Sequence, residues 1–121
     1  MREVIYIAGP ITCGGKADEQ TIRANVDIAD SYYHRLVALG IAPICPHTMA
    51  NYSDRSMTPV PHDDDHNMWM DICLSILARC DSMLLLPGWE TSTGSIIEED
   101  YARSHNLRIY RSIEEIEEDY A

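Results

Sequence analysis

The residue types most suited to chemistry lie between Ser92 and Glu98, shortly after an apolar run over residues 82–86. Ser92 is a typical N-cap residue, so the spacing predicts a helix that begins beside it. The unpaired N–H groups at a helix N-terminus attract anions. Glu98 falls about two turns further along, given 3.6 residues per turn. A carboxylate there can act on a molecule held by those N–H groups, so the stretch predicts an enzyme site for a small anionic ligand.

Glu98 has a rival in the neighbouring carboxylate, Glu99. By i, i+4 spacing, Gly94, Glu98 and Ala102 share a helix face that is small apart from the carboxylate and can approach the sheet or a ligand closely. Glu99 and Arg103 form an i, i+4 pair of the favoured polarity, which is typical of a solvent-facing side. The spacing therefore favours Glu98, although a second interpretation leaves Glu98 solvated or merely complementing the helix dipole.

Two further side chains lie where they could join this carboxylate. Tyr6 lies within the apolar run over residues 4–8. Its hydroxyl is either satisfied within the core or bonded to Glu98, because buried tyrosine hydroxyls need a partner. The first and third strands of doubly wound sheets are neighbours, which makes the second arrangement feasible. His47 follows Pro46 at the end of the second strand and either lines the ligand pocket or lies in a polar surface loop.

Neither a metal nor a nucleoside triphosphate site is expected. The segment over residues 62–66 carries two histidines at i, i+4 spacing, but it has no HExxH context and reads better as an exposed acidic loop. The loop that begins Gly9-Pro10-Ile11-Thr12 matches neither glycine-rich phosphate pattern, and its single lysine, Lys16, is not followed by Ser or Thr. We therefore predict no metal and no cofactor.

The composition bounds the class of protein. The chain has 121 residues, 45% of them hydrophobic, which fits one domain over residues 1–121. Its formal net charge of −11, with one lysine, excludes a basic groove for nucleic acid. No apolar run is long enough to span a membrane, and no secretory leader is recognisable, so a cytoplasmic location is expected. Three of the four cysteines, Cys45, Cys73 and Cys80, lie among apolar residues and are expected to be buried free thiols.

Strand and helix patterns alternate along the chain. Strands are predicted over 4–8, 41–45, 82–86 and 107–110, and Pro43 places the second of these near an edge. Helices are predicted from 18 or 21 to 39, over 68–79 and 94–105, and finally after Ser112, which caps the last one with Glu115. This order predicts an open parallel sheet of four or five strands with helices on both faces, a doubly wound, flavodoxin-like α/β fold. The loops after Ala8, Cys45 and Leu86 meet at the carboxyl edge, where such sheets bind ligands.

Four segments resemble the nucleoside 2-deoxyribosyltransferase-like superfamily and, within it, the small DUF4406-type proteins. They are IYIAGPI from Ile5, PICPH from Pro43, CDSMLLLPGW from Cys80, and the pattern Ser92-x-Gly94-x-x-x-Glu98-x-x-x-Ala102. The resemblance covers nearly the whole chain, and the first and last segments are its specific parts.

The resemblance implies cleavage of an N-glycosidic bond. Glu98 would attack the sugar C1′ and form a glycosyl-enzyme, as in retaining glycosidases, and Tyr6 would orient it. The substrate would contact Gly9, Pro10, Ile11 and His47 on the loops, together with Ser92 and Gly94. Relatives often complete the site across a dimer interface, so the resemblance also implies a homodimer or a higher homo-oligomer.

The residue six positions before the nucleophile separates two activities in the superfamily. Transferases carry an aspartate there, whereas nucleotide N-hydrolases carry a serine that contacts the 5′-phosphate. Ser92 therefore favours hydrolysis of a (deoxy)nucleoside 5′-monophosphate over deoxyribosyl transfer. A hydroxyl at a helix start suits a phosphate, which an aspartate would repel.

One position departs from the superfamily pattern. Characterised members carry an aspartate eight residues before the one that opens the third strand, and counting back from Asp81 reaches Cys73. The nearest carboxylate is Asp71, almost opposite on an ideal helix. Asp71 is the first candidate for the general acid, and His47, Asp65 and His66 are the others. A protein that binds or senses nucleotides without catalysis is the third interpretation.

Overall fold

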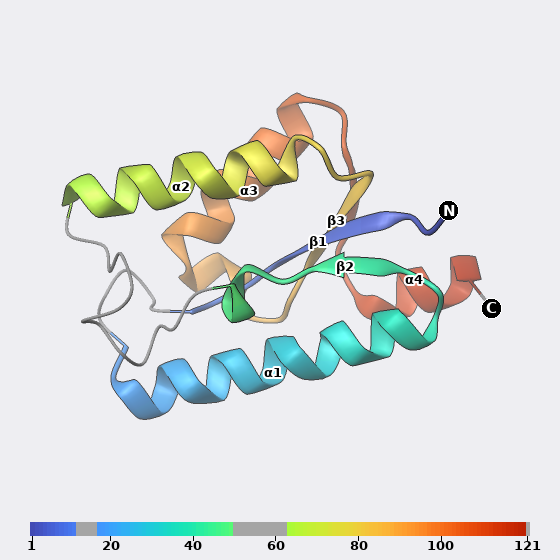
Figure 1. Cartoon of the computed structure of the whole chain (residues 1–121), viewed down its shortest axis with the longest axis horizontal. Helices are drawn as coiled ribbons and strands as arrows, with labels where there is room; N and C mark the ends of the chain where they lie inside the picture. The colour runs from blue at the N-terminus through green and yellow to red at the C-terminus, as the bar shows by residue number, and fades with distance from the viewer. Residues whose placement is uncertain (12–16, 50–62, 121) are drawn as a thin grey trace.

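The computed structural model describes residues 1–11, 17–49 and 63–120, with the side chains of 63–67 left aside. Figure 1 shows a parallel sheet between two layers of helices. The strands are β1 (Val4–Ala8), β2 (Ala42–Ile44), β3 (Ser82–Leu85) and β4 (Arg108–Tyr110), and the helices are α1 (Glu19–Ala38), α2 (Asp63–Leu77), α3 (Thr93–Ser104) and α4 (Ile113–Tyr120). Two short 3-10 turns, η1 (Pro46–Thr48) and η2 (Trp89–Thr91), follow β2 and β3.

The described strands are ordered β2-β1-β3-β4, and every pair is parallel. This confirms the predicted open, doubly wound α/β fold. Pro43 lies in β2, an edge strand, where its missing N–H costs no internal hydrogen bond. Tyr6 of β1 is in register with Met83 of β3, so the first and third strands are neighbours as expected.

Each face of the sheet has its own apolar core. Ile5 and Ile7 of β1 pack with Leu36 of α1 and Ile116 of α4 on one face. Tyr6 and Ala8 alternate with them and pack on the other face, with α2 and α3. The two-residue period of a strand produces this division, and Figure 1 shows the two pairs of helices on opposite sides.

Local signals account for the ends of α1. The Asp18 side chain accepts a hydrogen bond from the backbone N–H of Thr21 at 2.7 Å, a standard N-cap. Beyond the other end, Gly40 adopts φ +87°, a conformation that L side chains rarely adopt.

Helix α2 begins five residues earlier than expected, at Asp63 instead of Met68, and ends at Leu77 instead of Arg79. The apolar period starts only at Met68, and the preceding acidic residues suit a helix N-terminus.

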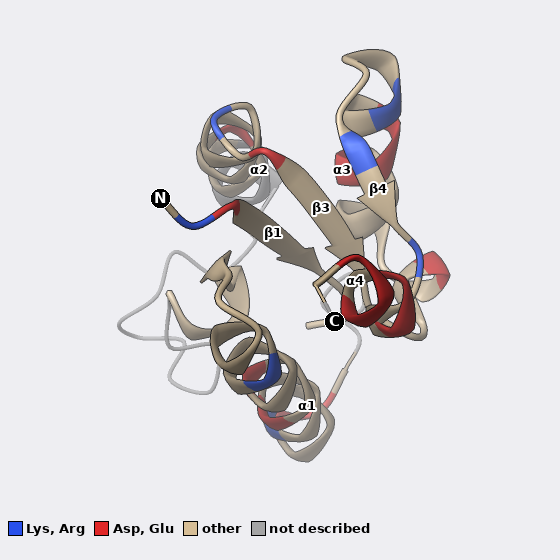
Figure 2. Cartoon of the chain, turned by 90° about the vertical axis from the view of Figure 1, so that its right-hand side faces the viewer, with Lys and Arg blue, Asp and Glu red and all other residues tan. Residues whose placement is uncertain are grey.

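Helix α4 is tied to the amino edge of the sheet. The Glu3 carboxylate accepts hydrogen bonds from the Ser82 hydroxyl at the start of β3 and from the Tyr120 hydroxyl in α4. Asp119 pairs with Arg108 at 2.8 Å. Figure 2 shows the acidic residues gathered on α4, mostly exposed, as expected of a solvated terminal helix. The first strand and the last helix are therefore joined at this edge.

Some sequence features fall outside the described residues. These are Cys13, Gly14, Gly15 and Lys16, most of the long segment after His47, and the side chains of Asp65 and His66. No helix in the described part of the chain is long and apolar enough to cross a membrane.

Candidate active site

Helix α3 carries Ser92 and Glu98 into the site at the carboxyl edge. Ser92 is its N-cap, as predicted, and its Oγ accepts a hydrogen bond from the Ser95 N–H at 3.2 Å. Thr93 and Gly94 are the first two helical residues, so their N–H groups have no acceptor within the helix. Glu98 lies in the second turn and is only 7% exposed. The interpretation of Glu98 as a solvated residue is therefore wrong.

Tyr6 and Glu98 are directly hydrogen-bonded. The Tyr6 hydroxyl donates to the Glu98 Oε2, and both side chains are buried. Tyr6 points to the α2/α3 face because of the strand alternation, and α3 returns along that face after β3. The fold thus joins residues that are 92 positions apart in the chain.

Burial sets the charge states of this pair. Desolvation raises the pKa of Glu98 to about 7, and the hydrogen bond from Tyr6 opposes that rise. Burial and the adjacent carboxylate raise the pKa of the Tyr6 hydroxyl far above its usual range. Tyr6 is therefore a neutral donor at every physiological pH, whereas Glu98 changes charge near neutrality. A carboxyl poised in this way is typical of catalytic sites.

The thiol of Cys73 completes this buried cluster from α2. Cys73 is 2% exposed and belongs to the same apolar cluster as Tyr6. Burial raises the pKa of the thiol to about 12, so it is protonated. The spacing from Asp81 marks this position in the sequence but predicts no role for a cysteine there.

Asp71 has a different environment from Cys73. It lies two residues earlier on α2, which on an ideal helix is almost the opposite side, and it is exposed to solvent. Within the described residues its carboxylate has no hydrogen-bond partner; only its backbone carbonyl is engaged, by the Ser75 hydroxyl at 2.7 Å. The structure brings Tyr6, Cys73 and Glu98 together and leaves Asp71 outside that cluster.

Glu99 is not on a solvent face, contrary to the expectation from its pairing with Arg103. The predicted pair exists, with Nε and Oε1 3.2 Å apart, but Glu99 is only 8% exposed. Arg111, which follows β4, approaches the other carboxylate oxygen to 3.6 Å. Two guanidinium groups thus compensate the buried charge of Glu99, whereas the one hydrogen-bond partner of Glu98 among the described residues is the neutral donor Tyr6.

The loop after β1 lies close against the end of β3. A Cβ added to Gly9 would lie 2.8 Å from the Leu86 Cβ, so only glycine fits there without displacement. Ile11 is held by the Asn25 side chain, which donates to its carbonyl at 3.0 Å. These contacts fix the start of the loop expected to touch the substrate.

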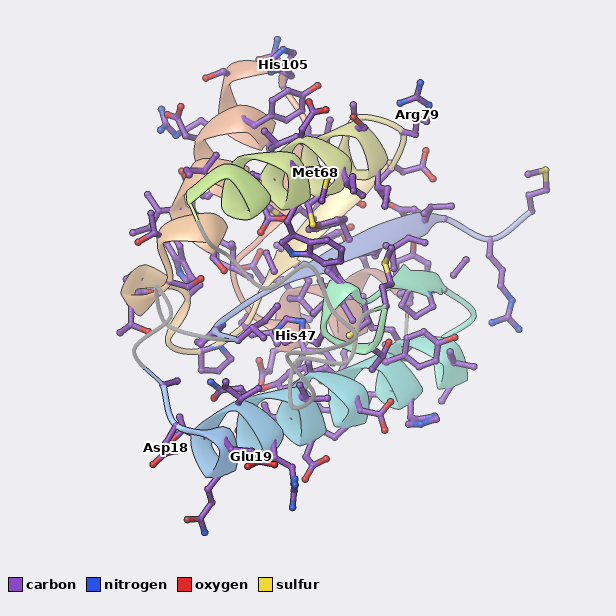
Figure 3. The ribbon with its side chains drawn as sticks, turned by 60° about the vertical axis from the view of Figure 1, so that its left-hand side comes forward. Asp18, Glu19, His47, Met68, Arg79 and His105 are labelled. Carbon is purple, nitrogen blue, oxygen red and sulfur yellow. The ribbon has the colours of Figure 1, made fainter. Side chains whose placement is uncertain are left out.

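His47 is an interior residue, only 1% exposed, so its placement in a polar surface loop is wrong. Figure 3 shows it inside the molecule, while the labelled Asp18 and His105 lie at the surface. Its Nε2 lies 3.1 Å from the Pro10 carbonyl oxygen, and burial lowers its pKa to about 4. A carbonyl only accepts, so Nε2 carries the proton and the neutral ring leaves Nδ1 as an acceptor. That Nδ1 is buried and has no hydrogen-bond partner in the part of the chain that the structure describes.

Gly94 faces α2 across a narrow gap. A Cβ at this position would lie 3.3 Å from the Met70 Sδ. A methionine side chain can adjust to such a contact more easily than backbone can. The small residue thus permits close packing of α3 on α2 near the exposed N–H groups.

The described residues contain no group of three or more His, Cys, Asp or Glu side chains that could hold a metal ion. Cys45, Cys73 and Cys80 are buried free thiols, as expected.

A family model described as Domain of unknown function (DUF4406) matches residues 3–111. The chain belongs to the DUF4406 family. The matched range takes in the four described strands and helices α1, α2 and α3, and it includes Tyr6, Cys73, Ser92 and Glu98. The candidate active site therefore lies within the DUF4406 domain. No curated protein matched the chain.

Proposed function

We propose that this protein hydrolyses the N-glycosidic bond of a (deoxy)nucleoside 5′-monophosphate, with Glu98 as the nucleophile. The observation that carries the proposal is the buried hydrogen bond from Tyr6 to Glu98. It lies one to two turns from the N-terminus of α3, beside Ser92. The resemblance to nucleoside 2-deoxyribosyltransferase-like proteins gives this pair its target.

The proposed reaction has two displacements. The Glu98 carboxylate attacks C1′ of the sugar as the bond from C1′ to the base nitrogen breaks, and the base leaves with the bonding electron pair. Water then attacks C1′ of the glycosyl ester and breaks the bond from C1′ to the Glu98 oxygen. The hydroxyl stays on C1′, the other proton of the water passes to solvent or to the departed base, and the sugar phosphate leaves with the carboxylate restored. The Tyr6 hydroxyl holds the Glu98 carboxylate in one orientation through its hydrogen bond.

The helix start supplies the binding group for phosphate in this proposal. Ser92 and the N–H groups of Thr93 and Gly94 present hydrogen-bond donors, and the helix dipole favours an anion there. Ser92 is neutral, so no carboxylate at this position opposes the phosphate. The same ligand would contact the ring of His47 and the loop formed by Gly9, Pro10 and Ile11.

The departing base needs a proton, and the described side chains offer no well-placed acid. His47 is neutral with its N–H directed to a backbone carbonyl, and Asp71 is exposed. Asp71 remains the nearest candidate carboxylate on α2, and water is the other source. A base that is stable as an anion would leave most readily from such a site.

A panel of nucleoside monophosphates tests the proposal, with free base measured by chromatography. We expect release of one base, and Glu98→Gln should slow it on the order of 10³-fold or more, as removal of a nucleophile does. Asp71→Asn should slow it by about 10²-fold if Asp71 is the acid, and leave it unchanged if water is. Equal rates for E98Q and the parent protein would exclude the mechanism.

The position of Cys73 favours a second candidate, a nucleotide-binding protein without catalysis. The resemblance implies a carboxylate where Cys73 faces the Tyr6–Glu98 pair, and a thiol is a weak acid. A thermal shift with nucleotides but no base release would support it. A new nucleoside formed when a second free base is added would instead favour the deoxyribosyltransferase.

A further inference from the structure

Two polar side chains, Asn25 of α1 and His47 of η1, lie against the loop that follows β1. Asn25 belongs to the core-facing side of α1, because it lies three residues after Ile22 and four before Ala29, and both of those are buried. Asn25 itself is half-buried, and His47 is almost completely buried. The two elements that carry them pack against each other. Polar groups in such places need specific partners.

Both side chains donate to backbone carbonyls of this loop, and the two carbonyls are consecutive. The Asn25 amide donates to the Ile11 carbonyl at 3.0 Å, and the His47 Nε2 lies 3.1 Å from the Pro10 carbonyl oxygen. Neither side chain makes another hydrogen bond within the described residues. In the described structure, therefore, the hydrogen bonds of both side chains serve this loop.

The bond from His47 also sets the direction of a backbone N–H group. All described peptide bonds are trans, so the Pro10 carbonyl and the Ile11 N–H point in opposite directions within one peptide plane. Since the carbonyl points to His47, the Ile11 N–H points away from it. The preceding residue, Gly9, fits closely against Leu86, which follows β3. Three consecutive residues of the loop are thus held from three different parts of the fold.

We propose that Asn25 and His47 are positioning residues for ligand binding, which hold two consecutive peptide units of the loop over residues 9–11 in the orientation that the ligand meets. The inference rests on the proposed function, in which this loop contacts the nucleotide. A loop that is ordered beforehand loses less conformational entropy when the ligand binds. These bonds therefore strengthen binding, while the chemical step depends on Glu98.

The first test is made by NMR on the protein without ligand. The ¹⁵N shifts of the His47 ring should show the tautomer with its proton on Nε2, because that nitrogen donates to Pro10. The order parameter of the Ile11 amide should be about 0.85, and it should fall toward about 0.6 in Asn25→Ala and in His47→Phe. His47→Gln keeps a donor near the position of Nε2 and should restore most of this order.

Two matched controls remove hydrogen bonds that stay within a single turn. Ser31→Ala on α1 removes a hydroxyl that donates to the Ile28 carbonyl at 2.7 Å. Thr48→Ala in η1 removes a hydroxyl that donates to the Cys45 carbonyl at 3.1 Å. Both controls should leave the Ile11 amide as ordered as in the parent protein.

The second test measures binding of the four 2′-deoxynucleoside 5′-monophosphates by calorimetry, in a Glu98→Gln background that slows turnover. For the nucleotide that binds best, Asn25→Ala should raise Kd by about 3- to 10-fold, as loss of one hydrogen bond does. With Glu98 present, the KM of base release should rise by a similar factor, while kcat should change by less than about twofold. Asn25 decides this test, because the ring of His47 is itself expected to contact the ligand.

Three results would overturn the inference. They are a His47 proton on Nδ1, an Ile11 amide as ordered in Asn25→Ala as in the parent, or a loosened loop with unchanged Kd and KM. Asn25→Ala carries the test if His47→Phe does not fold.

The proposed reaction can fail independently of this inference. Weaker nucleotide binding in Asn25→Ala, with the expected loss of order but no base release by the parent, would exclude the reaction and leave the positioning role standing. Base release with an unresponsive loop would do the opposite. A parent protein that binds none of the four nucleotides would overturn both.

Discussion

Two adjacent buried carboxylates, Glu98 and Glu99, have opposite electrostatic surroundings. Glu99 is compensated by Arg103 and Arg111. Among the described residues Glu98 has one hydrogen-bond partner, the neutral hydroxyl of Tyr6, and desolvation raises its pKa to about 7. A buried carboxylate that is paired with cations is compatible with a stable fold. A buried carboxylate without a cation destabilises the fold when it ionises, and such groups are typical of functional sites.

The difference between these carboxylates predicts opposite effects on stability. The folded pKa of Glu98, about 7, lies above its ordinary value of 4.5, so the folded state binds the proton more tightly. The free energy of unfolding therefore falls as pH rises from about 4.5 to about 7 and then levels off. Glu98→Gln cannot ionise, so at pH 8 it should be more stable than the parent by up to about 3 kcal/mol.

Urea denaturation at pH 8 and pH 4.5 measures this effect, and most of the gain should vanish at the lower pH. Glu99→Gln is the matched control, because it removes a paired charge and should lower stability at pH 8 by about 1 kcal/mol or more. A loss of stability in E98Q at pH 8 would show that Glu98 is not desolvated as described.

The hydrogen bond from Tyr6 to Glu98 predicts how the rate of base release depends on pH. The rate should follow ionisation of Glu98, rising with pH and levelling off above about 7. Tyr6→Phe removes a bond that lowers this pKa, so the midpoint should move up by roughly 1, the usual worth of a hydrogen bond to a charged group.

The measurement is a pH–rate profile of base release by the parent and Y6F proteins. Tyr101→Phe provides the control, because Tyr101 stacks on His105 at the far end of α3. An unchanged midpoint in Y6F would mean that another group governs the rate.

At the scale of elements, the close approach of β1 and β3 depends on Gly9. Gly9→Ala places a Cβ 2.8 Å from the Leu86 Cβ, which should cost about 1–3 kcal/mol of stability. Gly94→Ala meets only the flexible Met70 Sδ at 3.3 Å and should cost less than about 1 kcal/mol. Denaturation curves measure both, and a G94A protein less stable than G9A would contradict this ranking.

The elements show which features local patterns can predict. The strands and helices, the edge position of Pro43 and the Ser92 cap follow from periodicity, proline chemistry and capping preferences, which are properties of neighbouring residues. The contact of Tyr6 with Glu98 was predictable because strands one and three are neighbours in this class of sheet. The early start of α2 was missed because its first turn is polar and has no apolar period.

The site residues that were misjudged depend on partners distant in the chain. The buried charge of Glu99 is compensated in part by Arg111, which follows β4 in the chain, whereas Glu99 precedes β4. The interior position of His47 depends on the Pro10 carbonyl, 37 residues away. The spacing from Asp81 marks the position of Cys73, but its burial in the same cluster as Tyr6 depends on how α2 rotates on the sheet. Spacing within one element carries no information on these contacts.

At the scale of the whole molecule, both α2 and α3 expose apolar side chains. Met68 and Ile72 on α2, and Ile96 and Ile97 on α3, are each more than a third exposed. The resemblance implies a homodimer, and we propose that a second copy covers these residues. The mass in solution should then be about twice the 13.7 kDa of one chain.

Size-exclusion chromatography with light scattering tests the association. Ile72→Glu or Ile96→Glu should reduce the mass to that of one chain, because a buried unpaired charge is costly. Ile28→Glu on α1, which covers the opposite face, should leave the mass unchanged. A parent protein with the mass of one chain would refute the dimer.

The hydrogen bonds of Glu3 to Ser82 and Tyr120 have a practical consequence. They bring the beginning and end of the described chain together at the amino edge, while the candidate site lies at the carboxyl edge. A short glycine linker between the ends should therefore allow a circular permutant. New ends opened at the exposed turn of Gly40 would cut neither core nor site. Such a permutant would place β2 first in the chain and could still present Tyr6, Cys73 and Glu98 to one another.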